Sequence, residues 1–312
     1  MNLYSPEGIL TQNSKNYEYI SSLQGLQKAY ERQTILEAAV LMCDHSFNLH
    51  VSLPAGVRAI IPREEVQYCK PGEAVKDIAI LTRVGKPVCF KVMGFEKSPG
   101  GDLVVMLSRR MAQLECITNY ISSLVPGDII PAKITHIESF GAFADIGCGI
   151  VSLLSIDCIS VSRISHPSAR VSVGDYIHTV VKSIDGIGRI YISQKELLGS
   201  WEENAALFSE GETVNGIIRS VESYGIVVEL MPNLAGLAEY KPNVRAGQRA
   251  AVYIKSIIPE KMKIKLIMID AYDSDEKSPP LEYFIDTASV SHIDNWTYSP
   301  SSCNRVIESV FA

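Results

Sequence analysis

The sequence lacks long apolar runs and paired cysteines. Its 312 residues contain no stretch approaching 18 consecutive apolar residues, and residues 1–19 have neither a basic start nor an apolar centre. A transmembrane helix or a secretory signal needs such a segment, so we expect a cytoplasmic protein that does not associate with membranes. The seven cysteines are scattered without a CxxC motif, which favours free thiols over a disulfide framework or a zinc ribbon.

Motifs for catalysis and for metal or cofactor binding are also absent. The six histidines form no HxxxH or HExxH pair and the acidic residues are scattered singly, so the sequence predicts no metal site. There is no GxxxxGK[ST], no GxGxxG after a strand and no GxSxG, which leaves ATPase, dehydrogenase and hydrolase functions without support. His166, in the run SHPS, is interpreted as a loop residue. We predict a protein that is not an enzyme and uses no cofactor.

An excess of positive charge is missing as well. The chain has 29 basic and 35 acidic residues, a net charge of -6. Residues 271–312 hold two basic and seven acidic residues, so the rest of the chain is nearly neutral. A neutral body does not bind a polyanion by charge alone, and aromatic stacking would have to contribute to any binding of nucleic acid.

The most informative feature that is present is an internal repeat. The run GDIIPAKITHIESFGAFADI from Gly127 aligns without a gap with GETVNGIIRSVESYGIVVEL from Gly211, and a more distant copy, ILEAAVLMCDHSFNLHVSL, begins at Ile35. Apolar and polar residues alternate in each copy, which is typical of a strand with one buried face. The repeat therefore predicts an all-β fold built from three small closed barrels.

The extents of the three copies and the links between them set the predicted domain boundaries. The chain length and its 46% hydrophobic and 21% charged residues agree with two or three folded domains. The predicted organisation is an N-terminal extension (1–31), a degenerate first barrel domain (32–112), a second domain (124–198), a third domain (208–270) and an aromatic, acidic C-terminal extension (271–312).

The repeats resemble the S1 RNA-binding domain, which is an OB-fold barrel. The second copy carries the resemblance best, through PGDIIPAKITHIESFGAFADIGCGIVSLLSI, SHPSARVSVGDYIHTVVKSID and GRIYISQK. The three-unit arrangement is similar to the short ribosomal protein S1-like proteins of Gram-positive bacteria. The resemblance implies three tandem five-stranded OB-fold barrels with short linking helices. It further implies binding of single-stranded RNA, chiefly messenger RNA, and a role in translation with the small (30S) ribosomal subunit.

The resemblance also implies which residues of the second domain contact RNA. Phe140 and Phe143 match aromatic residues on the RNA-facing strands of the family, and Asp185 and Arg189 match its Asp and Arg at the end of the barrel. Ser152 stands where the family commonly has a histidine, so one stacking surface is lost there. Burial statistics alone favour core packing for the two phenylalanines, whereas the resemblance favours an exposed RNA face.

The third domain is expected to stack bases less and to attract phosphates more. Tyr224 stands at the first aromatic position and Lys263 at the arginine position, whereas Val227 and Glu239 replace the second aromatic residue and the histidine. With Lys255, these residues predict a weaker, more cationic RNA site. The alternative for the lysines is a solvated face on an edge strand.

The first domain keeps little of the expected stacking set. Phe47 matches the first aromatic residue, but His50, Pro62 and Val104 replace the other positions. By analogy with the long ribosomal relatives, this domain is expected to dock on the ribosome. Alternatively, the adjacent Arg109 and Arg110 face RNA.

The C-terminal extension and the function as a whole leave alternatives open. We expect LEYFIDTASVSHIDNWTYSP to fold back on the third barrel, with Ser301 or Ser302 capping a short helix that runs to Phe311. The main alternative function is an OB-fold protein-interaction scaffold. Another is an RNA-binding accessory subunit of an RNA-decay or transcription complex.

Overall fold

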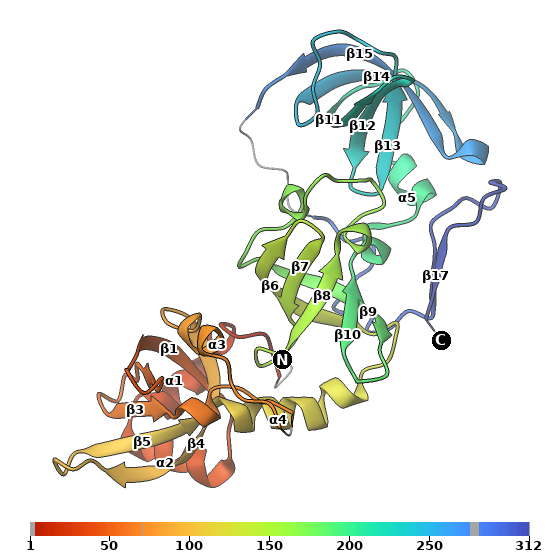
Figure 1. Cartoon of the computed structure of the whole chain (residues 1–312). Helices are drawn as coiled ribbons and strands as arrows, with labels where there is room; N and C mark the ends of the chain where they lie inside the picture. The colour runs from red at the N-terminus through yellow and green to blue at the C-terminus, as the bar shows by residue number, and fades with distance from the viewer. Residues whose placement is uncertain (1–3, 71, 275–280, 312) are drawn as a thin grey trace. The chain divides into compact units, whose positions relative to one another are not determined.

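The chain divides into two compact units. The computed structural model describes residues 4–70, 72–274 and 281–311, and Figure 1 labels its elements. Unit 1 comprises Met1–Leu124 and Asp145–Val151, and unit 2 comprises Val125–Ala144 and Ser152–Ala312. Over the described part of the chain, no helix is long and apolar enough to cross a membrane.

Unit 1 contains a closed five-stranded barrel. Its strands pair in the ring order β1-β2-β3-β5-β4, in which β3 and β5 are parallel and the other neighbours are antiparallel. The strands are β1 (Leu36–Cys43), β2 (Leu49–Val51), β3 (Arg58–Ile61), β4 (Pro87–Lys97) and β5 (Leu103–Ser108). The helices of this unit are α1 (Ser14–Ile20), α2 (Leu23–Arg32), α3 (Asp77–Leu81) and α4 (Arg109–Asn119).

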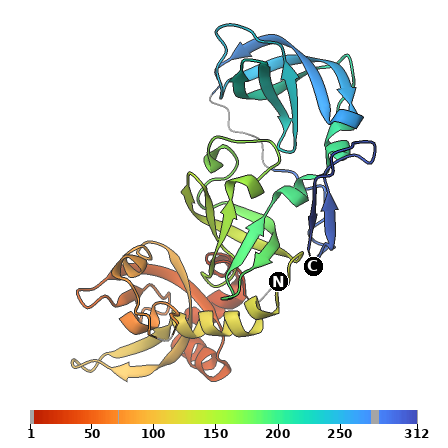
Figure 2. The ribbon, with the colours of Figure 1, turned by 45° about the vertical axis from the view of Figure 1, so that its right-hand side comes forward.

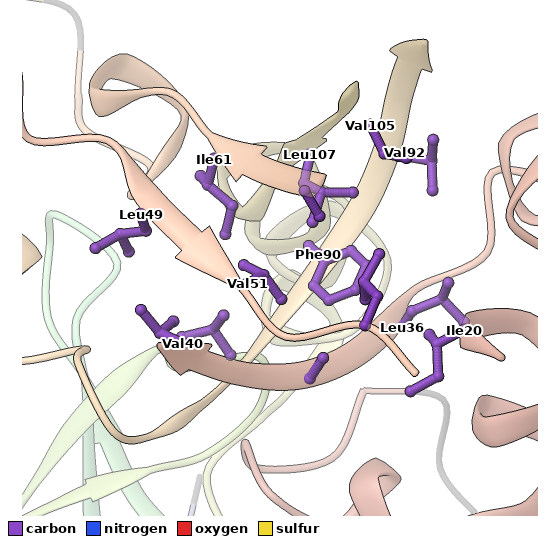
Figure 3. Close-up of a cluster of buried hydrophobic side chains, with 14 of the residues drawn as sticks. Ile20, Leu36, Val40, Leu49, Val51, Ile61, Phe90, Val92, Val105 and Leu107 are labelled. Atoms are coloured by element: carbon purple, nitrogen blue, oxygen red, sulfur yellow. The ribbon is translucent and has the colours of Figure 1, made fainter. Parts of the chain in front are cut away.

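The core of this barrel forms because every second residue of its strands is apolar. Phe90 is fully buried near the centre of the cluster, with Leu36, Val51 and Leu107 around it (Figure 3). Burying an aliphatic or aromatic side chain of this size contributes about 1.5 to 3 kcal/mol. Helix α2 adds Leu26 and Ala29 to the same cluster. The N-terminal extension is therefore part of the folded unit.

Two further sets of five strands have the same ring order, and most of their residues belong to unit 2. The last set closes into a barrel in the order β11-β12-β13-β15-β14, and the strands of the other set form the ring β6-β7-β8-β10-β9. The strands are β6 (Ile129–Glu138), β7 (Gly141–Asp145), β8 (Val151–Ser155), β9 (Tyr176–Ile184), β10 (Ile190–Ser193), β11 (Thr213–Glu222), β12 (Gly225–Met231), β13 (Leu234–Ala238), β14 (Arg249–Ile258) and β15 (Lys263–Tyr272). The repeats aligned in the sequence thus form sheets of equivalent topology.

Short helices join the strand sets, as the sequence predicts. The hydroxyl of Ser108 caps α4 by accepting a hydrogen bond from the Met111 N–H at 2.9 Å. Helix α5 (Trp201–Ala205) begins with a reciprocal capping box between Ser200 and Glu203. Trp201 is buried in the core cluster of the last barrel, so this link also packs against the barrel that follows it.

The C-terminal extension folds back, but as a hairpin. Its two strands, β16 (Asn295–Thr297) and β17 (Glu308–Val310), pair antiparallel in residues that Figure 2 colours dark blue. Trp296 and Tyr298 join the core cluster of the last barrel, as predicted, whereas Tyr283, near the start of the predicted run, packs with Val180 and Leu197 of the preceding strand set. The helix expected up to Phe311 is wrong, because residues 308–310 pair with residues 295–297. Residues 275–280 of the extension lie outside the described residues.

Arg109 is buried and paired, so the expectation that it faces RNA is wrong. Its side chain is 1% exposed, and its Nε donates to Glu7 Oε1 at 2.6 Å. Its Nη2 donates to Glu7 Oε2 at 3.0 Å and its Nη1 to the Val66 carbonyl at 3.1 Å. Arg110 keeps a half-exposed side chain and pairs with Glu65. A buried guanidinium needs such partners, and here it connects three segments of unit 1.

Candidate nucleic-acid interface

The two predicted stacking residues lie together at the start of β7. Phe140 occupies the β6–β7 turn and is 53% exposed, and Phe143 on β7 is partly buried. Their ring centroids are 6.1 Å apart and the ring planes are nearly perpendicular, at 88°. The Phe140 carbonyl accepts a hydrogen bond from the Ile156 N–H at 2.9 Å, which fixes the turn. Gly141 follows Phe140 because a Cβ at this position would collide with the Leu154 carbonyl.

Asp185 shapes the turn that presents Arg189. Its Oδ1 accepts hydrogen bonds from the N–H groups of Arg189 at 2.8 Å and Ile187 at 3.0 Å. These backbone hydrogen bonds, the Arg189 bond first, lower the pKa of Asp185 below its ordinary value. The Arg189 side chain itself is exposed. Asp185 therefore acts as a positioning residue, and Arg189 offers the guanidinium for a phosphate or a base face.

Ser152 does not contribute to the surface. It is 3% exposed, and its hydroxyl donates to the Ile190 carbonyl at 2.6 Å, across the parallel pair of β8 and β10. The hydroxyl is thereby satisfied inside the sheet. Among the residues predicted in this strand set, Phe140 and Arg189 are exposed, Phe143 and Asp185 are partly exposed, and Ser152 is buried.

Three further side chains belong to the same strand set and were not predicted from the sequence. His136 on β6 stacks on Phe143 with ring centroids 6.2 Å apart and planes 24° from parallel. The Lys133 ammonium lies 5.0 Å from the centre of the Tyr176 ring. Alternation along β6 places His136 on the face of Ile130, Ala132 and Ile134, which are buried, so the sequence pattern suggested a core position.

The last barrel has a groove that contains the residues predicted for it. Tyr224, Val227, Glu239, Lys255 and Lys263 all line a cavity of about 490 Å³ between the β11–β12 turn, β13 and β15. Tyr224 is 69% exposed. Lys265, another basic residue of this domain, and Met262 line the same groove. A tyrosine face beside ammonium groups suits a base with its phosphates.

Other basic residues of this barrel are engaged elsewhere. Arg219 pairs with Glu229 at 2.8 Å, Arg245 pairs with Asp273 at 2.7 Å, and Lys241 donates to the Ile269 carbonyl at 3.0 Å. The cationic character of the groove therefore rests on its lysines.

At the positions that match the stacking set, described residues of the first barrel make contacts within the barrel. Phe47 adopts a φ of +63°, and the Arg63 guanidinium covers its ring at 4.7 Å from the centroid. His50 Nε2 lies 3.1 Å from Asp44 Oδ2. Val104 is 6% exposed. Phe47, His50 and Val104 are thus each engaged in contacts within the barrel.

Single-stranded nucleic-acid surfaces combine exposed aromatic rings with cationic groups. This strand set has both, in the Phe140–Phe143 pair and in Arg189. Residues 124–194, which contain this site, match the family model of the S1 RNA binding domain. This part of the chain therefore carries the signature of that domain.

Most of the chain is similar to ribosomal proteins. It is 26% identical over 271 residues to the small ribosomal subunit protein bS1 of Staphylococcus epidermidis, covering 82% of this chain and 64% of that protein. It is 31% identical over 147 residues to the bS1 protein of Staphylococcus saprophyticus, covering 46% and 37%. The chain thus spans less than two thirds of the length of these relatives.

A comparison with solved structures gives a more distant similarity. A multidomain protein with nucleic acid binding domains from Streptococcus pneumoniae aligns over 76% of this chain and 73% of that protein, with 13% sequence identity and a TM-score of 0.24.

Proposed function

We propose that the protein binds single-stranded RNA, in particular messenger RNA, through its second and third domains (124–198 and 208–270). Each of the three five-stranded rings is then an OB barrel of the S1 type, and the protein acts without catalysis or cofactor. The observation that carries the proposal is the 53% exposure of Phe140 in contact with Phe143. A phenylalanine that packs in a core is normally buried, because exposing its ring forfeits the hydrophobic gain.

The cellular role that we propose is in cytoplasmic translation, with the small ribosomal subunit as partner. The names of the relatives support this role. The first domain (32–112) is proposed to provide the docking surface. Exposed apolar side chains support this assignment: Leu41 and Met42 on β1 are 63% and 51% exposed, and Ile78 and Leu81 on α3 are 66% and 49% exposed. Exposed apolar side chains of this kind are available for contacts with another protein.

Fluorescence anisotropy of a labelled oligouridylate tests the RNA proposal directly. The Phe140→Ala, Phe143→Ala double variant should bind about 2 to 6 kcal/mol more weakly, because each stacked base contributes about 1 to 3 kcal/mol. A residual affinity that falls with added salt is expected from the phosphate contacts of the lysines and Arg189. The matched control is Tyr17→Ala, Tyr30→Ala, which removes two exposed rings from unit 1.

Two outcomes would contradict the proposal. If the wild-type protein does not bind RNA, or if a folded double variant binds as tightly as wild type, the second domain is not the RNA site. The OB-fold protein-interaction scaffold would then be the better assignment. The exposed apolar residues of the first domain are the observation that favours this second candidate.

A further inference from the structure

The position that the family fills with a histidine contributes no ring in this protein. Ser152 stands there, and its hydroxyl is buried in a hydrogen bond with the Ile190 carbonyl. The surface around Phe143 therefore lacks the ring that a histidine at position 152 would supply, and a replacement would have to come from another strand. The neighbouring strand β6 does so, through His136.

His136 is placed as a surface ring in contact with the aromatic pair. Its side chain is 61% exposed, and its ring stacks on Phe143 at 6.2 Å. The Nε2 atom lies 2.6 Å from Glu138 Oε1. A carboxylate accepts hydrogen bonds, so the imidazole donates from Nε2, and this contact favours the orientation in which the ring lies beside Phe143.

The angles between the three rings distinguish their roles. His136 and Phe143 are 24° from parallel, whereas Phe140 presents its edge to Phe143 at 88°. Successive bases of a single strand stack in nearly parallel planes, and stacking on protein rings needs parallel faces. The pair that suits two successive bases is thus His136 with Phe143, and Phe140 suits a base turned away from them.

We propose that His136 is a base-stacking residue of the RNA site and that it replaces the ring missing at Ser152. The proposal rests on RNA binding by the second domain and adds one base to the site. Glu138 then acts as a positioning residue, because its carboxylate holds the imidazole beside Phe143. The ligand is a single-stranded RNA segment of which His136 stacks one nucleobase.

Three variants of the full chain test the role of the ring. With the labelled oligouridylate, His136→Ala should weaken binding about tenfold, which corresponds to loss of one stacked base. His136→Phe should restore the affinity to within about twofold, because a ring returns, whereas His136→Leu should not. The control is His45→Ala, which removes another exposed histidine in unit 1. Thermal melts followed by circular dichroism verify that every variant is folded.

The contact with Phe143 predicts a second result that a merely structural role would not give. In a double-mutant cycle, His136→Ala and Phe143→Ala should be non-additive for RNA affinity while leaving the melting temperature nearly unchanged. RNA binding by wild type together with equal binding by folded His136→Ala would overturn the role of His136 and leave the RNA proposal intact. Equal affinities of His136→Leu and wild type would also overturn it. Absence of wild-type binding would overturn both.

Discussion

At the scale of single residues, the buried Glu37 connects the stability of unit 1 to pH. Its Oε2 accepts hydrogen bonds from the N–H groups of Gly8 at 3.0 Å, Leu10 at 2.9 Å and Thr11 at 3.2 Å. Burial raises the pKa of Glu37 to about 7, although the backbone N–H groups act in the opposite direction. Glu7, which is paired with Arg109, adds a like charge nearby.

Glu37→Gln should therefore stabilise the protein at alkaline pH. The folded pKa lies above the ordinary value of 4.5, so the unfolded state loses its proton first and stability falls as the pH rises from about 4.5 to 7. The glutamine oxygen can still accept from the backbone, and its amide carries no charge. Calorimetry should show equal stability at about pH 4 and a gain of about 2 to 3 kcal/mol at about pH 8.

The exposed Glu31 provides the control for this experiment, since Glu31→Gln should change stability little at either pH. A gain for Glu37→Gln that is the same at both pH values would contradict the titration and indicate a packing effect. A loss at alkaline pH would show that the charged form is favoured by its three N–H donors.

Some residues of the candidate site could be predicted from the sequence and others could not. The family pattern singled out Phe140 and Arg189, and both side chains are exposed. His136 was missed because alternation along β6 assigns it to the buried face, and its exposure follows from where the strand leaves the core. The burial of Arg109 was missed for a related reason. Its partner Glu7 is 102 residues away in the chain, and no local pattern indicates such a pair.

At the scale of secondary-structure elements, local patterns predicted strands better than the C-terminal extension. The alternating repeats gave the three strand sets, because each strand has one face in a core. The serines before Cys303 suggested a helix cap, but the segment that follows pairs with residues 295–297. The strand pairing between residues 295–297 and 308–310 outweighs the preference of a serine for a helix N-cap, which is worth about 1 kcal/mol.

The hairpin should contribute strongly to the stability of unit 2. Trp296 is 8% exposed within the core cluster, and the Tyr298 hydroxyl donates to the Asn233 carbonyl at 2.6 Å. Trp296→Ala should lower the free energy of unfolding by about 3 kcal/mol, because it removes a large buried side chain. Urea unfolding followed by Trp201 fluorescence measures this, since Trp201 lies in the same cluster.

Val310→Ala in β17 is the matched control, because this side chain is 65% exposed and its truncation should cost little. A loss below about 0.5 kcal/mol for Trp296→Ala would mean that the hairpin is not docked in solution. In that case, the acidic residues of the extension would be the ones to test for an effect on RNA affinity.

At the scale of the whole molecule, the units are expected to serve different partners. The proposed stacking residues lie in unit 2, and the proposed docking surface lies in unit 1, where Ile78 and Leu81 expose apolar side chains. The Ile78→Asp, Leu81→Asp variant should cosediment several-fold less with small ribosomal subunits, because desolvating a carboxylate at an apolar contact is costly. Its affinity for the oligouridylate should stay within about twofold of wild type.

Leu207→Asp changes an equally exposed leucine in unit 2, and it should cosediment as wild type does. Unchanged cosedimentation of the unit 1 variant would exclude α3 as the docking surface. A parallel fall in RNA affinity would mean instead that ribosome association depends on bound RNA.

The segment Asp145–Val151 has a practical consequence for dividing the chain into pieces. It connects β7 to β8, yet it belongs to unit 1, where Asp145 accepts from the Glu7 N–H at 2.7 Å and Gly149 lies directly against the Arg109 guanidinium. A shorter polypeptide starting at residue 124 would retain this turn but lose Glu7 and Arg109. A recombinant fragment cut at the boundary of the family match would therefore expose the turn. We expect this isolated domain to be less soluble and less resistant to proteases than the same domain in the intact chain.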